Sequence, residues 1–181
     1  MQKKFPQLVP LIAVILFFTA CIKDTDFNQT DDIEVTPIIE LDFLFSTLTS
    51  QTFTDIGVNN IIISDTTDFS FFNDVFTIDN LEKAEFYFKN TNSMPVNFDM
   101  EIQFLDDNNE EHYLITIPIS SGELNIPIVS EHIENIEADG IISLTMANKV
   151  VLRIEASSVV DNVEGSLKLQ SKTTYYLKII Q

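Results

Sequence analysis

Apolar and polar side chains alternate with a period of two along much of the chain, most clearly over residues 96–105. This period is typical of a half-buried β-strand, because successive side chains of a strand point to opposite faces. A polar turn at residues 106–111 separates this run from a second alternating run at 113–119, so residues 96–119 are predicted to form a hairpin. The inward positions of its first strand are expected to be Val96, Phe98, Met100, Ile102 and Phe104.

Other segments give weaker versions of the same signal. Residues 130–139 are expected to form one or two helical turns, because Ile133 and Ile136 lie three residues apart and a glycine follows. In residues 37–48, one face of a strand is expected to carry Ile39, Leu41, Phe43 and Phe45. Further strands are predicted at residues 58–64, 83–90, 126–129, 140–147, 149–157 and 165–180, whereas residues 65–80 are harder to place.

Regularly spaced short strands with turn signals favour two packed antiparallel sheets. Composition agrees, since the chain has 15 Phe and 4 Tyr, and β-branched residues are frequent. Such side chains suit a pleated, half-buried surface. A length of 181 residues is that of one domain. We therefore expect an all-β sandwich over residues 37–181, after a leader at 1–20 and an acidic, flexible tether at 21–36.

The first residues have the layout of a secretory signal peptide. Lys3 and Lys4 precede an apolar run at residues 8–18, and the small residues Thr19 and Ala20 follow. The apolar run is shorter than the roughly 20 residues that a membrane-spanning helix needs. The sequence therefore predicts export from the cytoplasm.

Residues 18–21, Phe-Thr-Ala-Cys, resemble a lipobox, although most lipoboxes begin with Leu where this chain has Phe18. The resemblance implies cleavage before Cys21, lipid on its thiol, and anchoring to a membrane. Residues 22–26, Ile-Lys-Asp-Thr-Asp, resemble the surface-export signal of Bacteroidetes-type lipoproteins, with Thr25 interrupting the acids. We expect a cell-envelope protein of the outer membrane. The sequence is compatible with anchoring in the periplasmic leaflet or in the surface leaflet.

A strand, an Asn, small residues, a Pro and a second strand follow one another in residues 84–98. This order resembles an element of Ig-like β-sandwich lipoproteins and of the late-embryogenesis-type sandwich. The resemblance covers about 35 residues and implies a single Ig-like antiparallel β-sandwich. It implies a fold and no activity.

The charge is strongly acidic, with 10 basic and 28 acidic residues and a net charge of −18. It is also uneven, because residues 22–148 carry −22 and residues 149–181 carry +2. An acidic surface opposes binding to nucleic acid, which needs clustered Lys and Arg. It permits cationic partners and divalent metals. The alternative interpretation is that the acidic charge only keeps the protein soluble outside the cytoplasm.

The candidates for metal or catalytic chemistry are few. The acidic run at residues 106–111 could offer oxygen ligands to Ca²⁺, but it lacks the alternating pattern of a calcium loop, and a solvated hairpin tip is the alternative. His112 and His132 are the only histidines, too few for a zinc site by themselves. No nucleophile-elbow, phosphate-loop or dinucleotide motif occurs. We expect no catalytic, cofactor or metal site; weaker acidic candidates are Asp31, Asp32, Asp65 and Asp68.

Glycan binding is the other chemistry that the sequence leaves open. Sugar-binding modules stack rings on exposed aromatic residues, and the chain has no Trp. The candidates are Tyr87, Tyr113, Tyr175 and Tyr176, each of which could instead pack in the core or at a sheet edge. The run Asp65-Thr66-Thr67 matches a short O-glycosylation motif that the Bacteroidetes resemblance implies.

The sequence thus predicts a non-enzymatic, lipid-anchored binding or accessory module of the cell envelope. One alternative is a glycan-binding lipoprotein of a nutrient-uptake system, which an exposed row of tyrosines would favour. Another is an enzyme or enzyme subunit, which a deep cleft with convergent polar side chains would favour. A smooth acidic surface would leave the accessory role.

Overall fold

A computed structural model describes residues 34–49, 51–52, 62–157 and 163–180. The sandwich lies within one compact unit, Val35–Ile179. Its two four-stranded sheets are accompanied by three short helices, η2 (Ser70–Asn73), α3 (Val75–Asn80) and α4 (Asp139–Thr145). The strands are β1 (Glu34–Val35), β2 (Ile38–Thr49), β3 (Ile62–Asp68), β4 (Leu81–Asn92), β5 (Phe98–Leu105), β6 (Glu111–Ile119), β7 (Ile128–Glu137), β8 (Lys149–Ala156), β9 (Ser166–Leu177) and β10 (Ile179–Ile180).

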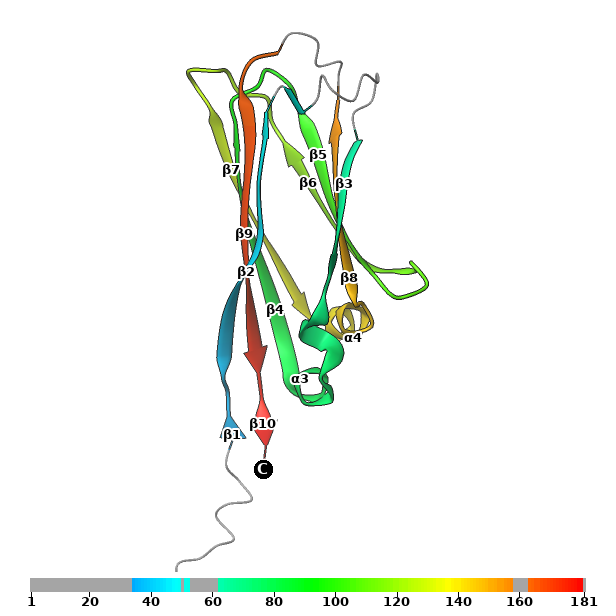
Figure 1. Cartoon of the computed structure of the whole chain (residues 1–181). Coiled ribbons are helices and arrows are strands. Elements are labelled where there is room, and N and C mark those ends of the chain that lie inside the picture. Colours follow the sequence, from blue (N-terminus) through cyan, green and yellow to red (C-terminus); the bar gives the residue numbers. More distant parts are fainter. Residues whose placement is uncertain (1–33, 50, 53–61, 158–162, 181) are drawn as a thin grey trace, which may run out of the picture. The chain divides into compact units, whose positions relative to one another are not determined.

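The long strands pair in a nested order. One sheet runs β2-β9-β4-β7 and the other β3-β8-β5-β6 (Figure 1). The antiparallel pairs β2·β9, β3·β8, β4·β7 and β5·β6 lie one inside the next along the chain. This is the order of an eight-stranded jelly roll, as if one long hairpin were folded into two sheets.

The predicted all-β antiparallel sandwich is confirmed. Its strand order, however, is not the Ig-like one that the resemblance implied. In an Ig domain the first and last strands belong to different sheets. Here β2 and β9 pair directly, over a register from Ile38↔Tyr176 to Thr49↔Ser166. The difference comes from long-range pairing, which the alternation within each strand does not specify.

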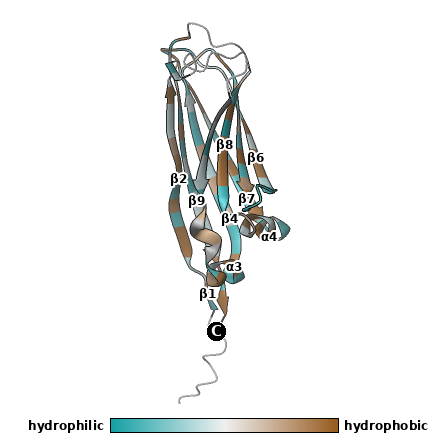
Figure 2. Cartoon of the chain, turned by 45° about the vertical axis from the view of Figure 1, so that its right-hand side comes forward, coloured by the Kyte–Doolittle hydropathy of each residue, from teal (hydrophilic) through white to brown (hydrophobic). Residues whose placement is uncertain are grey.

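The core lies between the two sheets, with β4 and β5 contributing most of its large side chains. The hairpin predicted at 96–119 is confirmed as β5 and β6, and its expected inward residues are all buried. On β4, Ala84, Phe86 and Phe88 share the buried face. Alternating hydrophobic and hydrophilic bands along strands such as β2 reflect this two-faced pattern (Figure 2).

The facing predicted for β2 is wrong beyond Phe43. The pairing with β9 shifts between Asp42 and Leu44, so Phe43 is the extra residue of a β-bulge. The bulge turns Leu44 toward the interior and leaves Phe45 outside, where it is 61% exposed. The inserted Phe43 packs into the core, with its ring 5.1 Å from that of Phe86.

Two neighbouring predictions are also wrong. Residues 130–139 were expected to be helical, but residues 130–137 belong to the edge strand β7; residues 140–147 were expected to be a strand, but most of them lie in helix α4, Asp139–Thr145. The three-residue spacing of Ile133 and Ile136 does not mark one face, because Ile133 is 53% exposed and Ile136 is buried. The helical spacing is instead that of Ile141 and Leu144, which are the buried residues of α4.

Asn92 explains the Asn–Pro segment that the sequence singled out. Its side chain is fully buried and donates to the carbonyl oxygens of Val96 at 2.8 Å and Ser120 at 2.9 Å. It accepts from the amide of Met94 at 2.9 Å. A Cβ on Gly122 would collide with the carbonyl oxygen of Asn92, so only glycine allows this close approach. The Asn92 side chain therefore stabilises the turn between β4 and β5 through these hydrogen bonds.

Candidate functional site

The strongest candidate site is a cleft between the two sheets at the edge where β2 and β3 lie, which we call the inter-sheet cleft. Its volume is about 650 Å³, within the usual range for small-molecule pockets. Strands β2 and β8 supply most of its apolar walls. These walls include Leu44, Leu48, Val150, Leu152 and Ile154.

Aromatic rings form the end of this cleft nearest η2. Phe43 lies 6.1 Å from Phe69 between ring centroids, and Phe71 stacks on Tyr175 at 3.9 Å. Tyr175 is 1% exposed, and burial raises the pKa of its hydroxyl. The ring arrangement offers apolar surface, and Tyr175 stays neutral at physiological pH.

Besides Asp42, Ser46 and Asp68, three polar side chains line the cleft. Asp65 and Thr67 on β3 pair in register with Leu152 and Val150, which face the core, so both point inward although both are exposed to solvent. On the opposite sheet, Thr173 is 1% exposed; among the described residues its hydroxyl makes no hydrogen bond of regular geometry, although it lies close enough to the Tyr175 hydroxyl to lower the pKa of that group slightly against the effect of burial. A buried hydroxyl without a partner is unfavourable unless a ligand or water satisfies it.

The opposite edge of the sandwich is bridged. Between β6 and β7, the Tyr113 hydroxyl donates to Glu134 Oε1 at 2.8 Å, and His132 Nε2 lies 3.3 Å from Glu134 Oε2. Burial and the Glu134 carboxylate raise the pKa of Tyr113 to about 12, so it remains a neutral donor. This cross-sheet bond ties β6 to β7, whereas a cleft separates the sheets at the β2 and β3 edge.

A larger hollow of about 840 Å³ lies beside α3 and α4, but its charged groups satisfy one another. Lys83 Nζ is 3.6 Å from Glu137 Oε1 and 5.4 Å from the ring centroid of Tyr176. Glu82 is 3.9 Å from Lys178. Because these charged side chains already interact with one another, few of them are available to bind a polar ligand there.

A shallow hollow of about 190 Å³ lies on the outer face of the β2-β9-β4-β7 sheet. Phe45 and Tyr87 lie on either side of β9, with Gln170 and Lys172 between them. A hydrogen bond to Glu131 raises the pKa of Tyr87. This is the place where the structure comes closest to an aromatic sugar platform.

The four tyrosines do not form the exposed row that glycan binding would favour. Tyr87 and Tyr176 face outward and are half-buried, Tyr175 is a core residue, and Tyr113 bridges the far edge. In the Asp65-Thr66-Thr67 run, strand alternation turns only Thr66 outward, because both of its neighbours face the cleft.

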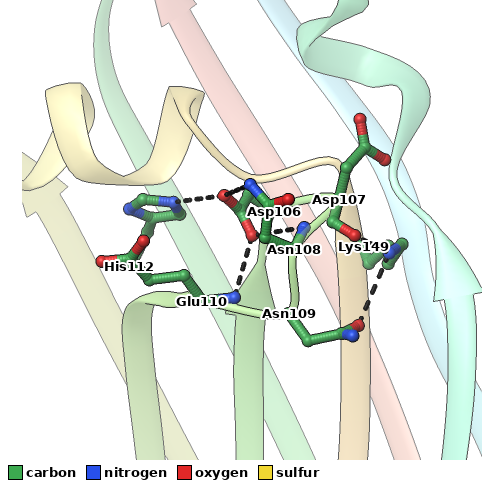
Figure 3. A network of polar contacts seen from close by, with 7 residues as sticks. All are labelled: Asp106, Asp107, Asn108, Asn109, Glu110, His112 and Lys149. Carbon is green, nitrogen blue, oxygen red and sulfur yellow. Dashed lines mark hydrogen bonds and ion pairs between the residues drawn. The ribbon is translucent and has the colours of Figure 1, made fainter.

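The acidic turn at 106–111 is held together by its own backbone (Figure 3). Asp106 Oδ1 accepts from the amides of Asn108 and Glu110, each at 2.8 Å, and these bonds help hold the pKa of the Asp106 carboxyl below its usual value. The Asp106 carboxylate also lies 3.7 Å from His112 Nε2. Lys149 Nζ donates to the Asp107 carbonyl oxygen at 3.2 Å. The turn therefore has a clear structural role.

The described acidic side chains and histidines do not form a metal-binding cluster. Within the described part of the chain, no three His, Cys, Asp or Glu residues lie close enough to hold a metal ion. No helix in that part is long and apolar enough to cross a membrane. The leader, Cys21, and the acids Asp31 and Asp32 lie outside the described residues.

Sequence reasoning missed the cleft, although it had named Asp65 and Asp68 as weak metal candidates. The run Ser-Asp-Thr-Thr-Asp in β3 has polar residues at every position, so its alternation does not reveal which face is inward. Only the pairing of β3 with the apolar strand β8 shows that Asp65 faces the interior. Knowledge of the partner strand would have been needed to predict the cleft, because the facing of the polar strand β3 follows from the apolar strand β8.

No known family matches the chain, and no curated protein matches it. Among solved structures it is similar to a protein of Parabacteroides distasonis described as secreted, at 16% identity and a TM-score of 0.45, covering 64% of this chain and 38% of that one. It is also similar to the VP2 subviral particle of infectious bursal disease virus, at 12% identity and a TM-score of 0.44, covering 78% and 32%. A third is tailspike protein 4 of bacteriophage CBA120, at 12% identity and a TM-score of 0.38, covering 80% and 19%. The chain thus spans well under half of each of these proteins.

Proposed function

We propose that this chain is a non-enzymatic binding module of the cell envelope, anchored to the outer membrane by lipid on Cys21, and that it binds a small ligand in the inter-sheet cleft. The open cleft is the observation that carries the proposal. Protein interiors are close-packed, so a hollow of about 650 Å³ between two sheets exposes apolar surface at a cost. A ligand that covers these walls would recover that free energy.

The lining favours binding over catalysis. The described lining residues of the cleft include no His, Cys, Lys or Arg. The reactive groups that the described lining does offer are carboxylates and hydroxyls, and no basic side chain stands beside a hydroxyl to activate it as a nucleophile. The carboxylates of Asp42, Asp65 and Asp68 and a few hydroxyls stand among apolar walls, which suits a ligand that is held and not transformed.

The anchor is supported by the sequence. A short basic start, an apolar run and small residues before Cys21 match the layout of a lipoprotein leader. Lipid on Cys21 would hold the sandwich at the membrane surface through the tether at 22–36. A binding module in this position would meet molecules of the envelope.

The cleft is tested by filling it. Thr67→Trp places a large ring in the cleft, whereas Thr66→Trp places the same ring on the outer face of β3, one residue away. We expect an uncharged apolar dye such as Nile red to bind the wild type and Thr66→Trp alike. Thr67→Trp should lose at least about tenfold in affinity, which corresponds to about 1.4 kcal/mol. Equal binding by both variants would rule out the cleft as the site.

Glycan binding is the second candidate, supported by the hollow between Phe45 and Tyr87. Phe45 is 61% exposed, unusual for an aromatic residue without a partner surface. Its ring and that of Tyr87 could stack on a sugar while Gln170 donates to hydroxyl groups. A glycan whose binding is lost in Phe45→Ala and kept in Thr67→Trp would favour this function over the cleft.

A further inference from the structure

We propose that the inter-sheet cleft selects cationic amphiphiles, small molecules with an apolar chain and an ammonium group, through the carboxylate of Asp65. This inference rests on the proposed function, because it names the ligand class of the same cleft. It arises from where Asp65 lies. Its register partner Leu152 is buried, so the carboxylate is on the inward face of β3, beside apolar walls.

No described residue neutralises this carboxylate. Asp42 and Asp68 are the other charged residues of the lining, and no Lys or Arg lines the cleft among the described residues. None of the described residues forms an ion pair with Asp65, unlike Glu40, which Lys172 contacts at 2.7 Å on the outer face. The cleft is therefore apolar in its walls and anionic in its charge.

Physical chemistry decides among the possible ligands. Any molecule that covers the apolar walls also removes water from Asp65. A neutral molecule would leave a desolvated carboxylate without a partner, which is costly. An anion would be repelled by the Asp65 carboxylate, within a stretch of net charge −22. A cation with an apolar chain covers the walls and pairs with Asp65 in one pose.

Thr173 is an independent indication of a ligand. It lies on β9, on the sheet opposite Asp65, and lines the same cleft. Its hydroxyl is almost fully buried and, among the described residues, has only the Tyr175 hydroxyl near it and no hydrogen bond of regular geometry. A polar ligand group in the cleft could satisfy this hydroxyl, which an aliphatic chain alone could not.

The test compares probes of one chain length and different charge: octylammonium, octanol and octanoate, with methylammonium as the cation without an apolar chain. The protein is a chain of residues 22–181, which retains every described residue; a cooperative melt verifies its fold. Calorimetric titration at about 150 mM salt screens diffuse attraction to the acidic surface. Octylammonium should bind most tightly, and methylammonium should show no saturable binding.

Asp65→Asn and Asp99→Asn remove the same charge from the cleft and from the exposed face of β5, respectively. Asp65→Asn should weaken octylammonium binding roughly tenfold and leave octanol binding equal or tighter, whereas Asp99→Asn should change neither. Equal losses in the two variants would overturn the inference, since the attraction would then be diffuse.

The outcomes separate the two proposals. If octanol or octanoate binds as tightly as octylammonium and Thr67→Trp blocks it, the ligand class is wrong and the cleft remains a binding site. If Thr67→Trp changes the binding of none of the probes, both the ligand class and the cleft site are overturned. Thr67→Phe replaces Thr67→Trp if the larger ring prevents folding.

Discussion

Two aspartates in this chain have opposite environments. Asp106 accepts hydrogen bonds from the backbone amides of Asn108 and Glu110 and holds the turn of the β5–β6 hairpin. Asp65 faces apolar walls and has no described partner. From the sequence both were only candidates for metal binding, Asp65 the weaker of the two, because a sequence shows the residue type and not the surrounding donors. The contrast makes Asp106 a structural residue and Asp65 the better candidate for recognition.

The role of Asp106 predicts a pH dependence of stability. Its pKa is lowered in the folded state, so its contribution is present above the ordinary aspartate pKa of about 4 and is lost as the pH falls through the lower folded value. We therefore expect Asp106→Asn to lower the free energy of unfolding at pH 7. The difference from wild type should shrink as the pH is lowered below about 4.

Urea melts of wild type and Asp106→Asn across this pH range measure the effect. Asp99→Asn is the matched control, because Asp99 is an exposed carboxylate on the same hairpin. Its effect on the free energy of unfolding should be small at every pH. A difference for Asp106→Asn that stays constant from pH 7 to strongly acidic pH would contradict the proposed role of the carboxylate.

At the scale of the element, strong alternation predicted strands well. The five inward residues expected of residues 96–104 are all buried, because β5 is an inner strand with a neighbour on each side. Prediction was poorer for β2 and β7. Both strands carry apolar residues on their exposed faces, as Phe45 and Ile133 show, and this obscures the period.

The β2 bulge could not be predicted, because it depends on the partner strand. Phe43 is inserted where the register with β9 shifts, and its ring stacks on Phe104 of the opposite sheet at 6.2 Å. The pairing of β3 with β8, which creates the candidate site, also joins strands that are far apart in the sequence. These contacts are tertiary, whereas alternation is local.

The facing of β5 gives a stability prediction. Phe98 is 1% exposed and Asp99 is exposed, although they are adjacent in the strand. Phe98→Ala should reduce the free energy of unfolding by about 3–5 kcal/mol, as expected for a large core aromatic residue. Asp99→Ala should cost under about 0.5 kcal/mol, as expected for a surface change. Denaturant melts measure both, and comparable losses would show that the facing is wrong.

At the scale of the whole molecule, the fold explains the uneven charge. Residues 149–181 carry a net +2 and supply β8, which lies between the acidic strands β3 and β5, and β9, which lies beside the acidic strand β2. Lys172 of β9 contacts Glu40 of β2 at 2.7 Å, and Arg153 of β8 contacts Glu101 of β5 at 3.5 Å. Each such surface pair contributes little alone. These pairs place Lys172 and Arg153 on the outer faces of the sheets. Among the described residues, no Lys or Arg lines the cleft.

The anchor is the largest-scale feature of the proposal. Cys21 is the only cysteine of the chain, so lipid attached through a thiol can be carried only there. Two or more acyl chains give stable attachment, because each buried CH₂ group contributes about 0.8 kcal/mol. The apolar run at residues 8–18 is too short to replace them by spanning the bilayer.

We therefore predict that Cys21→Ser abolishes incorporation of labelled palmitate and moves the protein from the membrane fraction to a soluble or mislocalised one. Lys23→Ala is the matched control, since it changes the tether two residues away and keeps the thiol; it should remain labelled. Metabolic labelling and fractionation of wild type and both variants measure the two effects separately. Label that persists in Cys21→Ser would mean that the lipid is attached elsewhere, and the lipoprotein assignment would fail. Unlabelled protein that stays on the membrane would show instead that an uncleaved leader or a protein partner holds it there.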